Sequence, residues 1–335
     1  MIKILTRCAL FVFVLLPLAA KAEPIKLKLA FFTSDRSLLY RAAVKPFVDA
    51  VNAEGRGLME IDVQFSGALG KDPAQQVQLV LDGTADIAFV VPGYTPDRFR
   101  DDAVIELPGQ FLDTREATLV FSRLVAAKLL KGYEDFYVIG AYASEPESIH
   151  TRPPIASLGD LRGKKIRVNN LIEAAALEKL GISPVLIPIN QTSDAIIGGK
   201  IDGATMPPAM LFEFGIGRFA TYHYLLGTSV PPLALLMNRN KFDSLPKQSQ
   251  DIIRKYSGEW AAARFIEAYD EADKQAMEQL RTDPRRKVIV PTAADFNTAH
   301  AAFGAVRTEW TAESPHNRDL LTTAESEIAK LRATR

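Results

Sequence analysis

The chain has 335 residues, of which 40 are basic and 40 acidic, with a single cysteine. This even balance excludes the basic stripe of a nucleic-acid-binding protein, so no nucleic-acid partner is expected. Near the start, an apolar run from Cys8 to Ala20 leads into Ala20-Lys21-Ala22. The run is shorter than the roughly 20 residues that cross a bilayer, and with the A-x-A pattern it predicts a secretory signal peptide over residues 1–22, cleaved after Ala22.

The exported part of the chain is expected in a bacterial periplasm. Residues 1–22 hold three of the 40 basic residues and no acidic ones, which leaves 37 against 40, a net charge of about minus three. Cleavage of the signal peptide removes the single cysteine, so burial of the core must stabilise the fold without disulfides. No second long apolar run follows, so contact with a membrane requires a partner.

The first predicted elements alternate between strand and helix. Ile25–Phe32 is a strand, Ser37–Asn52 a helix with one apolar face, and Ile61–Phe65 a second strand. A helix over Asp72–Leu81 and a strand over Asp86–Val91 follow. This order predicts a parallel sheet with helices on its faces.

A similar pattern returns in the second half of the chain. The segments QQVQLVLDGTADIAFVVP and QTSDAIIGGKIDGATMPP place Gly83 over Gly199 and Asp86 over Asp202. Each glycine is expected to end a helix in a left-handed cap, and each aspartate to cap the turn before a strand in a structural role. The repeat predicts two lobes of similar build.

The proline-rich segment Ser144–Leu158 is expected to cross from the first lobe to the second, after a helix at Thr114–Leu130 and a strand at Tyr137–Tyr142. Leu161–Val168 opens the second lobe. Tyr222–Met237, interrupted by two prolines, is expected to be a pair of strands that returns to the first lobe.

A helical pattern then runs from Ser244 to about Arg281, about 50 Å long and able to span both lobes, with Gly258 as its weak point. The predicted fold is therefore an α/β, two-lobed binding protein with a cleft between the lobes and a long helix across them. The expected divisions are a first lobe at 23–146 completed by about 236–245 and part of the C-terminal region, a second lobe at 147–235, the long helix at 246–281, and a C-terminal region at 282–335.

Catalytic and metal-binding motifs are missing from the sequence. It has no G-x-S-x-G, no H-E-x-x-H and no phosphate-binding loop, and the exported part has no cysteine. The histidines lack metal spacing and are expected in the core or on the surface; they are His150, His223, His300 and His316. We expect no cofactor, no metal and no enzymatic activity.

Arg167 is the candidate ligand anchor. In LRGKKIRV it stands between Ile166 and Val168 in a strand pattern. Its guanidinium can bind a carboxylate through two hydrogen bonds, although pairing with a structural Asp or Glu is the commoner role of such an arginine. A two-lobed, exported chain without a catalytic set favours a binding protein, in which a small ligand lies in the cleft.

The motifs LRGKKIRV, LEKLG, GGKIDG and KFDSLPKQSQ resemble the solute-binding subunits of TRAP transporters, the tripartite ATP-independent periplasmic transporters. The resemblance covers nearly all of the exported chain. It implies that Arg167 clamps the carboxylate of an organic acid and that the partners are the membrane subunits of a symporter. A receptor for an ABC importer or a sensor kinase, and a periplasmic enzyme, are the alternatives.

Two departures from the family pattern narrow the expected ligand. The family often has D-G-Q-E-N-P, with its Asn in the ligand site, where this chain has Met206 before Pro207. Sugar-acid binders also carry a second arginine upstream of the clamp, where this chain has Pro146 and Glu147. These departures disfavour sialic-acid-like and dicarboxylate ligands and favour a monocarboxylate with an aromatic or branched apolar body. The receptor is expected to be a monomer.

Other side chains are expected around the cleft because they follow strands or flank the clamp. The polar candidates are Thr33, Ser34, Tyr94, Gln110, Asn169 and Asn170, and the apolar candidates are Phe111, Met206, Phe212 and Tyr224.

Overall fold

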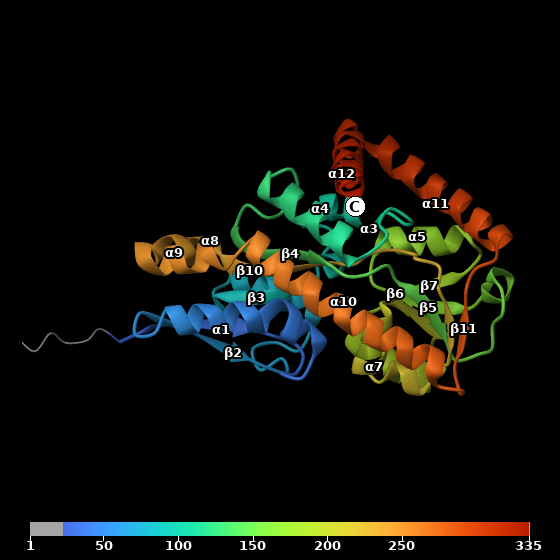
Figure 1. Ribbon diagram of the computed structural model, residues 1–335, viewed down its shortest axis with the longest axis horizontal. Helices are drawn as coiled ribbons and strands as arrows, with labels where there is room; N and C mark the ends of the chain where they lie inside the picture. Colours follow the sequence, from blue (N-terminus) through green and yellow to red (C-terminus); the bar gives the residue numbers. More distant parts are fainter. Residues whose placement is uncertain (1–22, 335) are drawn as a thin grey trace, which may run out of the picture.

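The computed structural model describes residues 23–334, so the signal peptide predicted over residues 1–22 and its cleavage after Ala22 lie outside the described residues. Within that range the chain forms two lobes, each built on one sheet with helices packed against it (Figure 1). The predicted two-lobed α/β fold is confirmed.

The first lobe has a five-stranded sheet in the order β2-β1-β3-β10-β4. β1 pairs in parallel with β2 and β3, as the predicted β-α-β order requires, and β10 pairs antiparallel with β3 and β4. The strands are β1 (Ile25–Ala30), β2 (Met59–Gln64), β3 (Ile87–Val90), β4 (Phe136–Ala143) and β10 (Pro232–Asn238). The main helices are η1 (Tyr40–Val44), α1 (Lys45–Glu54), α2 (Gln76–Leu81), α3 (Ala103–Glu106) and α4 (Thr114–Ala126).

The second lobe has a six-stranded sheet in the order β11-β9-β5-β8-β6-β7, in which β6 pairs in parallel with β7 and β8. Its strands are β5 (Ser148–Thr151), β6 (Lys165–Val168), β7 (Ser183–Leu186), β8 (Gly203–Met206), β9 (Tyr222–Tyr224) and β11 (Lys287–Ile289). Its helices are α5 (Leu171–Lys179), α6 (Thr192–Ile197) and α7 (Pro208–Glu213).

The repeated Gly and Asp positions have equivalent roles in the two lobes. Gly83 and Gly199 both have left-handed backbones, with φ of 76° and 67°. The carboxylate of Asp86 accepts from the backbone N–H of Lys28 at 2.8 Å, and that of Asp202 accepts from the N–H of Lys165 at 2.8 Å. Each aspartate thus binds the neighbouring strand of its own sheet, which confirms the predicted structural role.

The chain crosses between the lobes twice, and the two crossings pair with each other. The N–H of Glu147 donates to the carbonyl of Ser229 at 2.8 Å, and the N–H of Thr228 donates to the carbonyl of Glu147 at 3.0 Å. The first crossing is shorter than the predicted linker, because β5 lies inside that segment. The second ends at β10, which starts at Pro232 in the first sheet, before the boundary expected at 235.

The prediction of a single helix over Ser244–Arg281 is wrong, because the structure divides this segment between α9 (Lys247–Lys255) and α10 (Glu259–Thr282). The break falls at Gly258, whose φ of 62° and ψ of −124° are not helical and whose N–H donates to the carbonyl of Ile139 in β4 at 2.8 Å. A glycine tolerates this backbone where other residues do not. α10 still packs on α4 and β4 of the first lobe and on α7 of the second (Figure 1).

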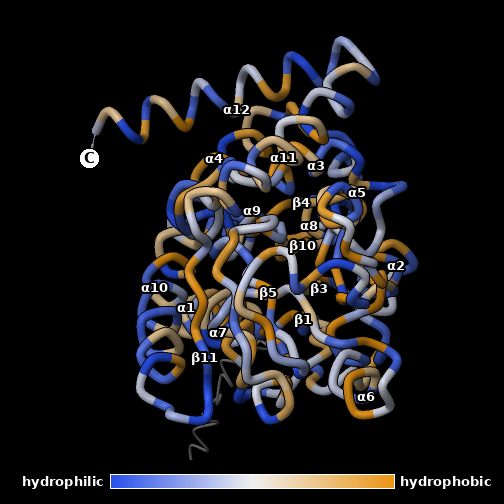
Figure 2. The backbone as a smooth tube through the Cα atoms, turned by 90° about the vertical axis from the view of Figure 1, so that its right-hand side faces the viewer, coloured by the Kyte–Doolittle hydropathy of each residue, from blue (hydrophilic) through white to orange (hydrophobic). Residues whose placement is uncertain are grey.

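Two C-terminal helices complete the fold, α11 (Ala293–Glu313) and α12 (Pro315–Ala333). α11 packs on α5 of the second lobe and α12 on α3 and α4 of the first, so the C-terminal region also connects the lobes. Figure 2 shows apolar colouring on the central strands and alternating colours along α12. No helix in the described range has the length and apolar character needed to cross a membrane.

Candidate functional site

The two lobes meet around a cavity of about 40 Å³, close to the space of one water molecule. Both lobes, both crossings and α10 contribute to its wall. The lining residues are Phe32, Leu39, Val91 and Tyr94 from the first lobe, Ser144, Glu147, Pro231 and Leu233 from the crossings and β10, Arg167, Asn169, Ile189, Pro207 and Met210 from the second lobe, and Tyr269 from α10.

Arg167 is the cation of this wall, and it is only 1% exposed. Its Nε donates to the carbonyl of Ile187 at 2.9 Å and its Nη1 to the carbonyl of Thr205 at 3.2 Å. Its Nη2 donates to the Oη of Tyr94 at 2.9 Å. These bonds use three of the five N–H groups of a guanidinium and leave one on Nη1 and one on Nη2.

Arg167 does not form the structural ion pair that the sequence left open. Within residues 23–334, no carboxylate oxygen lies within 4.0 Å of its nitrogens. A buried cation held by carbonyl and hydroxyl oxygens keeps its charge available for an anion that enters the cavity.

Two buried carboxyl groups, Glu147 and Glu173, lie near the guanidinium and influence each other's titration. Burial, followed by the charge of Glu173, raises the pKa of Glu147 well above its usual value, while the charge of Arg167 lowers it. Burial also raises the pKa of Glu173, against hydrogen bonds from Thr228, Glu147 and Thr205. Burial therefore favours a proton held by the pair.

Hydrogen bonds hold this carboxyl pair beside the two paired crossings between the lobes. The Oε1 of Glu147 accepts from the Nδ2 of Asn169 at 2.8 Å. Glu173 accepts from the hydroxyl of Thr205 at 2.7 Å and from the hydroxyl of Thr228 on the second crossing. The pair thus connects both crossings to the second lobe, and Glu147 also lines the cavity.

Two contacts join the lobes across the cleft. The Oη of Tyr94 accepts from Arg167 and also from the N–H of Ile189 at 3.0 Å. The backbone N–H of Leu38 donates to the Oε2 of Glu213 at 2.6 Å. Burial raises the pKa of Glu213 to about 6, while the bond from Leu38 lowers it.

The structure brings three of the predicted site residues to the cavity, namely Arg167, Tyr94 and Asn169. Asn170 is adjacent, but its Oδ1 caps α5 by accepting from the N–H of Glu173 at 2.7 Å. Its Nδ2 donates to the Oδ1 of Asn169 at 2.8 Å. Asn170 therefore positions its neighbour instead of lining the cavity.

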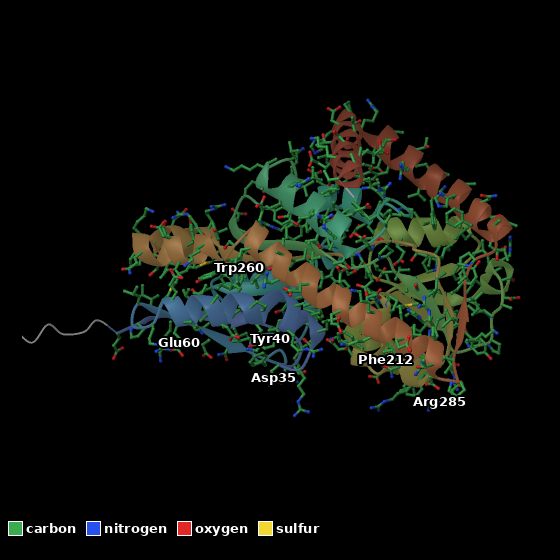
Figure 3. The ribbon with its side chains drawn as sticks, in the orientation of Figure 1. Asp35, Tyr40, Glu60, Phe212, Trp260 and Arg285 are labelled. Atoms are coloured by element: carbon green, nitrogen blue, oxygen red, sulfur yellow. The ribbon has the colours of Figure 1, made fainter. Side chains whose placement is uncertain are left out.

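Thr33, Ser34 and Phe212 lie at the outer side of the cleft. The hydroxyl of Thr33 donates to Ser37 within its own loop at 2.9 Å. Ser34 and Phe212 border a surface hollow. Figure 3 shows Phe212 on α7, the helix that packs against α10. The ring of Phe212 also faces the guanidinium of Arg286 at 4.9 Å.

The remaining four predicted residues do not line the cavity either. Gln110 donates to the carbonyl of Val104 at 3.1 Å, and the ring of Phe111 is buried in the first-lobe core. The side chain of Met206 is buried in the core. Tyr224 donates to Asp295 at 2.9 Å.

Several cavity residues were not predicted from the sequence. Tyr269 falls within the long helical pattern predicted from Ser244 to about Arg281, and Glu147 stands where sugar-acid binders carry a second arginine. The apolar walls are Phe32, Leu39, Val91, Ile189, Met210 and Leu233. A signal existed for Phe32 and Val91, because both follow the ends of neighbouring parallel strands, where ligands commonly bind.

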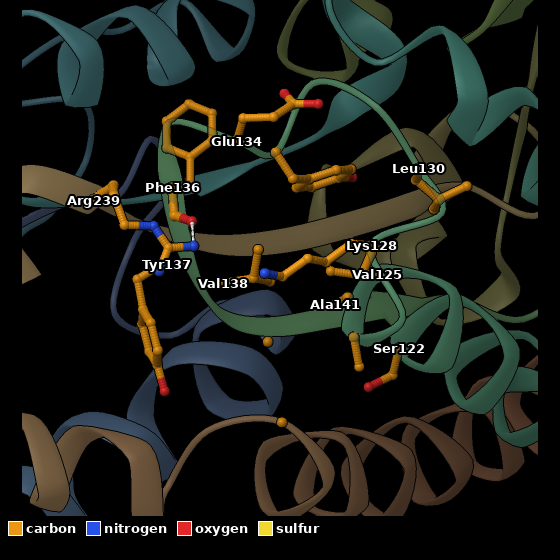
Figure 4. A pocket seen from close by; sticks show the side chains of 14 residues that line it. Ser122, Val125, Lys128, Leu130, Glu134, Phe136, Tyr137, Val138, Ala141 and Arg239 are labelled. Atoms are coloured by element: carbon orange, nitrogen blue, oxygen red, sulfur yellow. Dashed lines mark hydrogen bonds between the residues drawn. The ribbon is translucent and has the colours of Figure 1, made fainter.

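A larger hollow, of about 680 Å³, lies on the first lobe between α4 and the edge strand β4 (Figure 4). Its arginine, Arg239, donates to the carbonyl of Phe136 at 2.5 Å. No second-lobe residue lines it, so lobe closure cannot enclose a ligand there. The small cavity at Arg167 is the better candidate despite its size.

Two of the histidines form a buried pair in the second sheet. The Nδ1 atoms of His150 and His223 lie 2.8 Å apart, and burial lowers their pKa values to about 4 and about 2. The Nε2 of His150 lies 3.2 Å from the carbonyl of Met206. Residues 23–334 contain no group of three side chains that could hold a metal ion.

Comparisons with known proteins identify the family to which the chain belongs. Residues 29–313 match the family described as bacterial extracellular solute-binding protein, family 7. One similar solved structure is a TRAP solute-binding protein specific for aromatic acids, from an unidentified microbe of a marine metagenome, in complex with metahydroxyphenylacetate. It is 26% identical to this chain, with a TM-score of 0.84, and the match covers 91% of this chain and 99% of that one.

A TRAP solute-binding protein from Rhodoferax ferrireducens, solved with benzoate, is 24% identical, with a TM-score of 0.84 and coverage of 92% and 99%. The C4-dicarboxylate-binding periplasmic protein DctP of Rhodobacter capsulatus is 22% identical over 73% of this chain and 74% of its own. The chain therefore belongs to the family 7 solute-binding proteins, which are periplasmic receptors of TRAP transporters and not enzymes.

Proposed function

We propose that this receptor captures a small organic monocarboxylate at Arg167 and delivers it, as a monomer, to the membrane subunits of a TRAP symporter. The observation that carries the proposal is the unused pair of N–H groups on the Nη atoms of a buried guanidinium. One carboxylate can accept both, and such charge-assisted bonds are about twice as strong as neutral ones.

The walls of the cavity support an aromatic or branched apolar body on that acid. Six apolar side chains surround the guanidinium, and in the described range Arg167 is the single cation among the lining residues. A second carboxylate would be buried there without a partner, which costs several kcal/mol. The aromatic-acid specificity of the metagenomic relative supports the same ligand class.

Ligand entry requires the walls to move. A cavity of about 40 Å³ is smaller than an aromatic ring, so an acid of this class binds only if the lobes separate by a small rotation about the paired crossings. We infer that the ligand stabilises the arrangement in which both lobes contact it.

A thermal-shift screen of carboxylic acids, followed by calorimetry, tests the proposal. A true ligand at 100 times its Kd adds about 2.7 kcal/mol to the stability of the receptor. Arg167→Lys keeps the charge but loses the two-pronged geometry, and we expect at least a tenfold loss of affinity. Lys165→Ala, on the exposed face of the same strand, is the matched control and should bind like the parent. Equal binding by the parent and Arg167→Lys would refute the clamp.

A further inference from the structure

We propose that Tyr269 on α10 selects acids that carry a hydroxyl group on the apolar body, by forming a hydrogen bond to that hydroxyl inside the cavity. The inference rests on the proposed function, since it concerns the same ligand. It assigns to the lobe-spanning helix a direct part in ligand selection.

The hydroxyl of Tyr269 lacks an ordinary hydrogen-bond partner. The residue is 0% exposed and lines the cavity together with Arg167. In the described part of the chain, its Oη has one hydrogen-bond partner, the Sδ of Met210 at 3.8 Å, and a thioether is a weak acceptor. Buried hydroxyls normally find an oxygen or nitrogen partner, so this one is available to a molecule that enters the cavity.

A second tyrosine nearby shows the ordinary arrangement. Tyr142 and Tyr269 lie against the same ring, that of Phe265, with centroid distances of 4.6 Å and 4.4 Å. The hydroxyl of Tyr142 donates to the carbonyl of Ala43 at 3.3 Å, and Tyr142 is not among the cavity residues. The two tyrosines thus share their packing but differ in what the hydroxyl faces.

The surroundings keep the Tyr269 hydroxyl protonated and able to donate. Burial, followed by the charges of Glu145 and Glu213, raises its pKa well above the usual value. Burial, followed by the charge of Asp273, likewise raises the pKa of Glu145 well above its usual value. Tyr269 can therefore donate to a ligand oxygen, while its own oxygen can accept from a ligand hydroxyl.

The size of the cavity makes this contact difficult to avoid. Arg167 on β6 and Tyr269 on α10 line the same space of about 40 Å³. When the lobes close on a ring whose carboxylate is bound at Arg167, the ring lies against the other lining residues, which include Met210 and Tyr269. An unsubstituted ring leaves the phenol hydroxyl unpaired, whereas a hydroxylated ring satisfies it.

The test compares matched acids by calorimetry on the parent, Tyr269→Phe and Tyr142→Phe. The pairs are benzoate with 3-hydroxybenzoate, benzoate with 4-hydroxybenzoate, and phenylacetate with 3-hydroxyphenylacetate. In at least one pair, the hydroxylated acid should bind the parent about three- to tenfold more tightly, the range that one hydrogen bond supplies. This ratio should approach one in Tyr269→Phe and remain in Tyr142→Phe.

The outcomes separate this inference from the proposed function. If the acids bind through Arg167 but the hydroxyl gives no gain, or if Tyr269→Phe keeps the gain, the role of Tyr269 is overturned and the receptor function stands. If no acid binds the parent, both fail. Tyr269→Phe removes only a hydroxyl whose partner is a thioether, so its thermal midpoint should equal that of the parent, and this measurement confirms that the variant is folded.

Discussion

The buried carboxyl pair of Glu147 and Glu173, beside the crossings between the lobes, should make the receptor less stable as the pH rises. Burial raises the pKa values of both Glu147 and Glu173 above their usual values, which favours a proton held by the pair. A group with a raised folded-state pKa contributes stability that is complete below its unfolded pKa and is lost as the pH rises toward the folded value. Glu147→Gln places an amide N–H where the shared proton lies, while its oxygen still accepts from Asn169.

The magnitude follows from the number of protons involved. Above about pH 6 the unfolded chain has released its carboxyl protons, whereas the raised pKa values let the native pair keep one of them. While the pair keeps that proton, the free energy of unfolding falls by about 1.4 kcal/mol for each pH unit. Other buried acids add to the slope of the parent, but Glu147→Gln should remove the share of one proton.

Urea titrations at pH 6, 7 and 8 measure this difference. The stability of Glu147→Gln should fall less steeply than that of the parent by about 1.4 kcal/mol per pH unit. Glu60→Gln, at an exposed position on β2, is the control and should follow the parent slope. If Glu147→Gln also followed the parent slope, the shared proton would not exist in the native state.

Three further predictions concern single positions. Burial lowers the pKa of His223 to about 2, so the stability of the fold should fall as the pH drops below about 6.5. His223→Phe should therefore make the urea midpoints at about pH 5 and pH 7 more alike, and an unchanged difference between these midpoints would contradict this reasoning. Gly258→Ala should cost about 1–3 kcal/mol in urea because its φ is 62°, whereas Gly304→Ala in helix α11 should not destabilise. Tyr94→Phe removes the acceptor of two bonds across the cleft and should weaken acid binding about tenfold by calorimetry; unaltered affinity would exclude a role in holding the clamp.

The sequence predicts the parts of the fold that depend on local chemistry. The repeat at Gly83 and Gly199 identified the left-handed caps, and the repeat at Asp86 and Asp202 identified two equivalent turns. Arg167 was found because one cation interrupts an apolar strand. These features need only the immediate neighbours of each residue, so their pattern is visible without the structure.

The cavity wall could not be predicted in the same way, because it is assembled from segments far apart in the chain. Leu39 and Leu233 have no local signal that separates them from ordinary core residues. Tyr269 has the spacing of a packed helix face, and its missing partner appears only in the structure. The break at Gly258 was placed correctly as a weak point, but a helical stripe that continues on both sides concealed the change of direction.

The paired crossings have a consequence for which substitutions the connection between the lobes tolerates. Glu147 and its partners on the second crossing are joined through main-chain atoms, which every amino acid except proline supplies equally well. A change of side chain at these positions therefore leaves the main-chain pairing in place, whereas proline at position 147 or 228 would remove one of its two N–H donors.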